Sequence, residues 1–194
     1  NLARLAETLL DLINPDDSED AVRQAGEVVN GFPLSYERAW LSGMRAKLGL
    51  VTEEAGDMEL ATGLLAVLET RNADFTRVLR SLSSAVPGDA AKTRALFDNP
   101  AGFDVWLPLW QARLQRENLP ADERTASMNR VNPVYVPRNH MVEAALESAS
   151  KGDLAPFERL LGVLEDPFTE RQGLEVYALG APSDFGPYTT YCGT

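Results

Sequence analysis

Apolar residues recur at intervals of three and four along almost the whole chain, and this spacing is the strongest constraint on its fold. In the first segment, Leu2, Leu5, Leu9 and Leu12 fall at such intervals, which places them on one face of an amphipathic helix. No segment stands out for the alternation of apolar and polar residues that is typical of a strand. The sequence therefore predicts an all-α fold, with further helices around residues 21–29, 36–48, 60–68, 75–82, 90–97, 103–114, 120–131, 138–149 and 154–164.

Prolines and glycines predict where these helices begin and end. Gly31 and Pro33 interrupt the apolar pattern and predict a break between the second and third helices, because proline removes a backbone donor. Pro108 lies inside an apolar stretch, where it predicts a kink or a break. Asp74 is placed to cap the helix that follows it, and Gly49 is placed to end the third helix.

Residues 132–151, NPVYVPRNHMVEAALESASK, are the segment around which the chain is organised. Two prolines bracket an extended lead-in, since a residue before proline is pushed out of the helical region, and a helix then begins near Arg138. Arg138, Asn139 and His140 crowd its first turn. We interpret all three as structural: Arg138 and Asn139 hydrogen-bond neighbouring loops, and His140 is a partly buried packing residue. A single histidine with no second ligand or base nearby is weak evidence for catalysis.

The most aromatic stretch of the chain carries Phe103, Trp106, Leu107, Trp110 and Leu114. Such a stripe can be a groove that binds a partner, but aromatic residues at spacings of three and four more often form a hydrophobic core. The sequence predicts a core.

Helical periodicity is lost after Pro167, where glycines and prolines punctuate the chain. Residues 1–167 are therefore predicted to form a helical domain, and residues 168–194 an irregular C-terminal tail. The tail still carries Tyr177, Phe185, Tyr188 and Tyr191. Since disordered segments are poor in aromatic residues, we expect this tail to pack on a surface.

The charge and the cysteine content exclude several classes of protein. The chain has 29 acidic and 18 basic residues and a net charge of -11, whereas a nucleic-acid partner requires clustered basic residues. No apolar run reaches the roughly 20 residues of a membrane span. The single cysteine, Cys192, fits a reducing compartment, so we expect a cytoplasmic protein. The start at Asn1, inside a helical pattern and without an initiator Met, suggests a piece of a longer chain.

Motifs that carry chemistry are almost absent. There is no glycine-rich phosphate loop after a strand, no Cys/His pair at zinc spacing, and only one histidine for a triad. The run Asp184-Phe185-Gly186 spells the magnesium motif of kinases but lacks the preceding catalytic loop. We therefore predict no catalytic, cofactor-binding or metal-binding residue in this chain.

Five segments, in their order and spacing, resemble the C-terminal part of the selenoprotein O family. They are YERAWLSGMRAKLGL at residues 36–50, RNADFTRVLRSL at 71–82, NPVYVPRNHMVEAAL at 132–146, KGDLAPFERLLGVLEDPF at 151–168 and TYCGT at 190–194. The likeness extends over nearly the whole chain. It implies a parent protein about two and a half times longer.

The resemblance implies a function that the residues of this chain do not themselves indicate. Members of the family have an N-terminal part with a protein-kinase-like fold, which binds ATP with magnesium and transfers AMP to hydroxyl groups of proteins. The nucleotide-binding and metal-binding residues would belong to that missing part, which would be the partner of this chain alongside the protein substrates. The family carries selenocysteine or cysteine at the position that matches Cys192. By itself, Cys192 in its glycine-flanked tail would be an ordinary exposed thiol. The resemblance instead implies a redox role for Cys192, through a disulfide with a cysteine of the missing part.

Two hypotheses for the function follow. In the first, the chain is the helical C-terminal region of a selenoprotein O-like pseudokinase that acts as a protein adenylyltransferase, and its role is structural or regulatory. In the second, the chain is a stand-alone helical module for protein interaction, without enzymatic activity. The sequence encoded upstream of Asn1 distinguishes the two.

Overall fold

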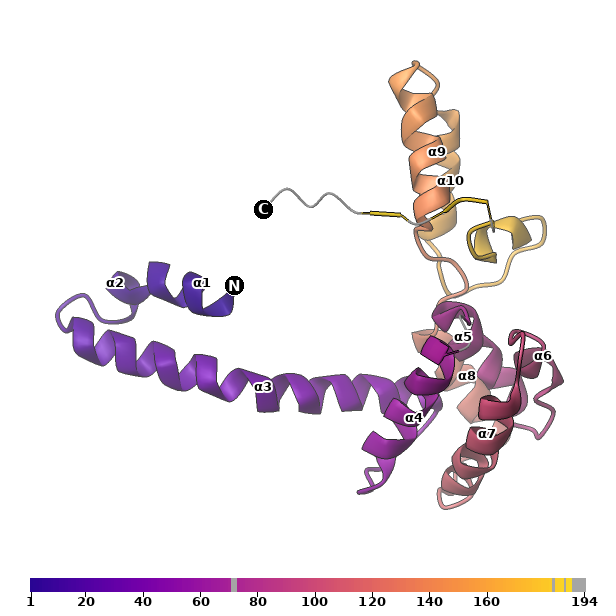
Figure 1. Cartoon of the computed structure of the whole chain (residues 1–194), viewed down its shortest axis with the longest axis horizontal. Helices are drawn as coiled ribbons and strands as arrows, with labels where there is room; N and C mark the ends of the chain where they lie inside the picture. Colours follow the sequence, from indigo (N-terminus) through magenta and orange to yellow (C-terminus); the bar gives the residue numbers. More distant parts are fainter. Residues whose placement is uncertain (71–72, 183, 187, 190–194) are drawn as a thin grey trace. The chain divides into compact units, whose positions relative to one another are not determined.

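The computed structural model describes residues 1–70, 73–182, 184–186 and 188–189. These residues form ten α-helices and one short 3-10 helix and include no strand, which confirms the all-α prediction (Figure 1). No helix among them is both long enough and apolar enough to cross a membrane. The chain divides into two compact units, Asn1–Met44 and Arg45–Thr194. The boundary predicted at residue 167 stays a prediction.

The first unit contains α1 (Leu2–Thr8), α2 (Leu10–Ile13) and most of α3 (Ser18–Leu48). The acidic turn before α3 caps it, because Oδ1 of Asp17 accepts hydrogen bonds from the backbone N–H groups of Glu19 and Asp20, at 3.1 and 3.0 Å. Within residues 1–44, all of which the structure describes, the buried apolar side chains are those of Ala21, Ala25 and Met44.

The predicted break at Gly31 and Pro33 is wrong, because α3 runs without interruption through both residues (Figure 1). Proline inside a helix removes the bond to the carbonyl four residues earlier, here that of Val29, and its ring crowds that carbonyl, at a cost of about 3 kcal/mol. Pro33 is exposed, so water can reach that carbonyl. Glycine costs a helix only about 0.5–1 kcal/mol relative to alanine. A helix of 31 residues therefore tolerates both.

The core of the second unit is formed by α4 (Asp57–Thr70), α5 (Phe75–Ala85), α6 (Ala91–Arg94), α7 (Ala101–Leu114) and α8 (Ala121–Val131). Phe103, Trp106 and Trp110 are buried. The two indole rings stack at 5.9 Å between centroids. Each indole N–H donates to a carbonyl, that of Leu60 at 2.8 Å and that of Leu48 at 2.9 Å. The predicted aromatic core is confirmed, and α7 continues through Pro108, so no break occurs there.

Gly49 ends α3 as predicted and lets α3 and α8 approach closely. Its φ is +73°, in the left-handed region that favours glycine. A Cβ at this position would lie 2.7 Å from Sδ of Met128 on α8. Helix α3 therefore stops where its last turn contacts α8.

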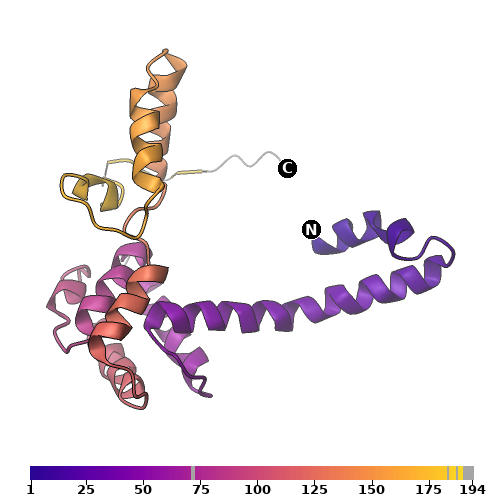
Figure 2. The same ribbon diagram turned by 180° about the vertical axis from the view of Figure 1, so that it is seen from behind.

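The remaining helices, α9 (Asn139–Ser150) and α10 (Ala155–Leu164), form a hairpin (Figure 2). Gly152, with φ of +90°, makes the turn between them. Asp153 supports the start of α10, because its Oδ1 accepts a bond from the N–H of Ala155 at 3.1 Å. Beyond α10, the carbonyl of Pro167 accepts bonds from the N–H groups of Val134 and Tyr135. The described part of the predicted tail contains one 3-10 helix, η1 (Glu175–Ala178).

Candidate functional site

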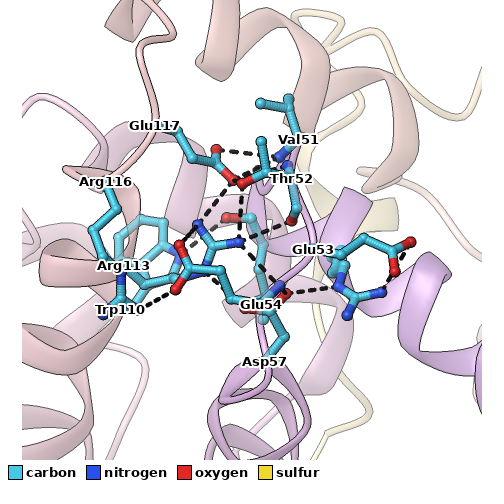
Figure 3. A network of polar contacts seen from close by, with 12 residues as sticks. Val51, Thr52, Glu53, Glu54, Asp57, Trp110, Arg113, Arg116 and Glu117 are labelled. Carbon is cyan, nitrogen blue, oxygen red and sulfur yellow. Dashed lines mark hydrogen bonds and ion pairs between the residues drawn. The ribbon is translucent and has the colours of Figure 1, made fainter.

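Buried charged side chains among the described residues form a network of ion pairs between α4, α7 and α8 (Figure 3). Arg113 lies at its centre. Its Nε is 2.7 Å from Oδ1 of Asp57, and its Nη1 is 2.9 Å from Oε1 of Glu117. Oε2 of the same Glu117 is 2.7 Å from Nη1 of Arg124. The side chains of these four residues are at most 3% exposed.

The network also holds the loop that follows α3. Glu117 accepts hydrogen bonds from the backbone N–H groups of Val51 and Thr52, at 3.0 and 2.9 Å, and from the hydroxyl of Thr52 at 2.8 Å. Arg45, in the last turn of α3, places its Nε 2.7 Å from Oδ2 of Asp57. Buried charges are tolerated only when they are paired and hydrogen-bonded. Here each carboxylate has at least two such partners.

Both carboxylates of the network are held in the charged form. Burial opposes the ionisation of Glu117, but the bonds from Arg124, Thr52 and Val51 outweigh it and lower the pKa of Glu117 to about 2. The pKa of Asp57 is likewise lowered, because bonds from Arg113, the N–H of Glu54 and Arg45 exceed the cost of burial. A general acid or base needs a pKa near the working pH. The network is therefore a structural clamp.

Carboxylates on helices usually lie on solvated polar faces, and Asp57 and Glu117, whose side chains are buried, are exceptions. A signal was present in the spacing. Arg113 and Glu117 continue the series Phe103, Trp106 and Trp110 at steps of three and four, so they lie on the buried side of α7 and just past its end. Opposite charges four residues apart can pair along a helix, and the place of these two in the apolar series indicates that the pair is buried.

Arg138, predicted to be structural, ties the start of α9 to the start of α5. Its Nη1 is 2.8 Å from Oδ2 of Asp74. The other carboxylate oxygen, Oδ1, accepts a bond from the N–H of Arg77 at 2.9 Å, so that Asp74 caps α5 as predicted. Asn139 is exposed, and its side chain makes no hydrogen bond to another described residue. The bond to a neighbouring loop predicted for Asn139 is therefore not seen in the described part of the chain.

His140 packs against the described part of the tail. It is half-buried, and its ring meets that of Phe185 edge to face, with 5.7 Å between centroids. Phe185 stacks in turn on Tyr188 at 5.9 Å. The hydroxyl of Tyr188 donates to Oε1 of Glu143 on α9 at 2.6 Å. Residues 185 and 188 thus pack on α9.

The comparisons with known proteins agree with the resemblance seen in the sequence. Residues 1–165 match the family model described as protein adenylyltransferase SelO. The chain belongs to this family. It is 47% identical to the protein nucleotidyltransferase YdiU of Cereibacter sphaeroides over 195 residues, 47% identical to that of a Mycobacterium species, and 43% identical to that of Agrobacterium fabrum. Each alignment covers the whole of this chain.

The same relatives are much longer than this chain. The chain spans 39% of the Cereibacter sphaeroides and Mycobacterium relatives and 40% of the Agrobacterium fabrum relative. Among the described residues, no group of three or more His, Cys, Asp and Glu side chains is arranged to hold a metal ion. Cys192, the predicted redox residue, lies outside the described residues.

Proposed function

We propose that this chain is the helical C-terminal region of a protein adenylyltransferase, and that it supports a catalytic part formed by other residues of the parent protein. The observation that carries the proposal is the family match over residues 1–165, together with relatives of which this chain spans about two fifths. A match along the whole chain to longer nucleotidyltransferases favours this function over that of a stand-alone interaction module.

The surface of residues 1–44 supports a scaffolding role. Large apolar side chains are exposed along all three of its helices: Leu2, Leu5, Leu9, Leu12, Ile13, Val22, Val28, Phe32, Leu34 and Tyr36. Extended apolar surface of this kind marks sites of protein contact. We propose that the kinase-like part of the parent packs against it.

The chemistry of the parent follows from the family and is part of the same proposal. The parent binds ATP and magnesium through residues outside this chain and transfers AMP to hydroxyl groups of protein substrates. The cytoplasmic location expected from the cysteine content stays a prediction.

An experiment with three proteins tests the proposal. The full-length protein, this chain alone, and the parent lacking this chain are each incubated with labelled ATP, magnesium and a generic protein acceptor. We expect AMP transfer by the full-length protein, none by this chain, and a large loss when the chain is removed. AMP transfer by this chain alone would contradict the assignment. Full activity of the parent without it would contradict the supporting role.

Cys192 belongs to the proposal as a redox residue that forms a disulfide with a cysteine of the catalytic part. Non-reducing peptide mapping of the full-length protein after mild oxidation tests this. We expect a peptide that joins Cys192 to such a cysteine, and a change of activity on reduction. Recovery of Cys192 only as a free thiol, with activity indifferent to reductant, would reject the redox role.

A further inference from the structure

A cavity lies within residues 45–194, lined by none of the residues of the ion network and not by Phe185. Its walls are α5, α6, residues 134–135 and the segment 170–179, and its volume is about 560 Å³. Small-molecule sites commonly have volumes of about 300–1,000 Å³. The cavity is therefore large enough for an organic ligand.

The charge of this cavity is opposite to that of the chain. Arg77, Arg80, Lys92 and Arg171 line it, against two carboxylates, Glu170 and Glu175. In the whole chain, acidic residues outnumber basic ones by 29 to 18. A concave surface with an excess of positive charge concentrates anions from solution.

Two of the four cations are fixed in the wall by neutral acceptors. Nη1 of Arg80 donates to the carbonyls of Asn129 and Asn132, at 2.9 and 3.1 Å. The guanidinium of Arg171 donates to carbonyls at the end of α10 and just beyond it, and lies over the ring of Tyr135 at 5.3 Å. These acceptors orient the guanidinium groups without neutralising them. Arg80 also pairs with Glu170 at 3.3 Å, but that carboxylate is 73% exposed, and exposed pairs are weak.

The other two cations are available to a ligand. Arg77 on α5 and Lys92 on α6 make no ion pair or side-chain hydrogen bond with any residue in the described part of the chain. Phosphate monoesters carry a charge of about -1.5 to -2 at pH 7, and Arg and Lys side chains are their usual protein partners. Both line the same cavity, on helices that contact each other, and are therefore suited to bind a phosphate group.

The rest of the lining decides the orientation of the ligand. Leu96, Val134 and Leu179 offer an apolar surface. Glu175 lies on the opposite wall and stays charged, since a hydrogen bond from the N–H of Gly173 lowers its pKa. Its charge repels a phosphate, which is thereby directed toward α5 and α6.

We propose that this cavity binds a small phosphomonoester. Arg77 and Lys92 hold the phosphate, and the apolar body of the ligand lies against Leu96, Val134 and Leu179. The segment 170–179 forms one wall of the site. The predicted tail thereby contributes to a binding site.

Isothermal titration of the full-length protein with phenyl phosphate tests the proposal, with inorganic phosphate and phenol as comparators. We expect phenyl phosphate to bind more tightly than either comparator. The double variant Arg77→Glu/Lys92→Glu should bind at least about tenfold more weakly, which corresponds to about 1.4 kcal/mol. The matched control is Arg159→Glu, because Arg159 is exposed, unpaired among the described residues, and outside the cavity. The affinity of Arg159→Glu for phenyl phosphate should stay within about twofold of that of the wild type.

Two further measurements distinguish a loss of specific binding from misfolding and from non-specific binding. The neutral variant Arg77→Gln/Lys92→Gln should also lose affinity while keeping the thermal midpoint of the wild type. Hydrogen exchange should show protection of amides in residues 173–179 when phenyl phosphate is bound. The proposal is overturned if phenyl phosphate does not bind, if the neutral variant retains the affinity, if Arg159→Glu loses as much, or if inorganic phosphate binds equally well.

Discussion

The two compact units of the chain differ in how far they bury their large apolar side chains. In residues 45–194, α7 buries Phe103, Trp106 and Trp110 against neighbouring helices. In residues 1–44, Val28 is 75% exposed and Leu12 is 80% exposed, and Met44 is the largest buried apolar side chain. The second unit therefore has a core of its own. The first displays on its surface the kind of side chains from which a core is built.

This difference separates two kinds of helical stability. Most helical stability in proteins comes from packing an apolar face rather than from intrinsic propensity. The helices of the second unit obtain that packing within the chain. Those of the first unit bury few apolar side chains. We propose that the rest of the parent protein covers their apolar surface. Substitutions in the two units should differ accordingly.

The largest effect is expected for Trp110→Ala in the buried stripe. The change opens a cavity and leaves the carbonyl of Leu48 without its indole donor. We expect a loss near the upper end of about 3–5 kcal/mol in the free energy of unfolding, measured by urea denaturation. A loss below about 1 kcal/mol would show that the indole is not in a core.

The second largest loss in the free energy of unfolding is expected for Glu117→Gln. This change removes a negative charge that the buried guanidinium groups of Arg113 and Arg124 share. Breaking a buried pair by removing one partner costs about 3–5 kcal/mol, and the retained amide oxygen should place this variant at the lower end. The exposed pair Arg4–Glu7 is the control. Glu7→Gln should change the free energy of unfolding by less than about 1 kcal/mol. Equal effects of the two substitutions would contradict the clamp.

The pH dependence of the free energy of unfolding is a second test of the same network. The pKa of Glu117 is about 2 in the folded chain, below its usual value of 4.5. A carboxylate whose pKa is lower in the folded state than in the unfolded state stabilises the fold. This stabilisation is complete above the pKa of the unfolded state and is lost as pH falls through the pKa of the folded state. The wild type should therefore lose stability between about pH 4.5 and pH 2, and Glu117→Gln should lose less in that window. Parallel curves for the two proteins would refute the assignment.

Arg138→Ala should have a moderate effect, since it removes the ion pair with Asp74 at the start of α5. The Arg138 side chain is 15% exposed, so we expect a loss of about 1–2 kcal/mol, the scale of a hydrogen bond to a charged group. The neighbouring substitution Asn139→Ala serves as its control and should stay within about 0.5 kcal/mol, as exposed surface changes do. A larger loss for Asn139→Ala would reverse the roles assigned to the two residues.

The smallest effect on stability is expected for Val28→Ser in the first unit. Val28 is largely in solvent, so the free energy of unfolding of this chain should change by less than about 0.5 kcal/mol. In the full-length protein the same substitution should lower AMP transfer, because it places a hydroxyl in the proposed contact with the catalytic part. Unchanged activity, together with unchanged stability, would show that this face has no partner there.

The sequence by itself determined the helical class, most helix ends and the aromatic core. The physical reason is that these features are local: a spacing of three and four defines one helix face, and Gly49 or Asp74 acts on backbone groups within its own turn. The motifs also determined the family, which the comparisons confirmed.

Only the tertiary structure decided which distant groups meet. Glu117 contacts Thr52, and Arg138 contacts Asp74, across 65 and 64 residues of chain respectively. The cavity joins α5 and α6 to residues 170–179. Even the passage of α3 through Pro33 depended on its surroundings, because the proline is exposed. Periodicity tells which side of a helix is buried, but a charge on that side stays buried only where the packing of other helices supplies its partner.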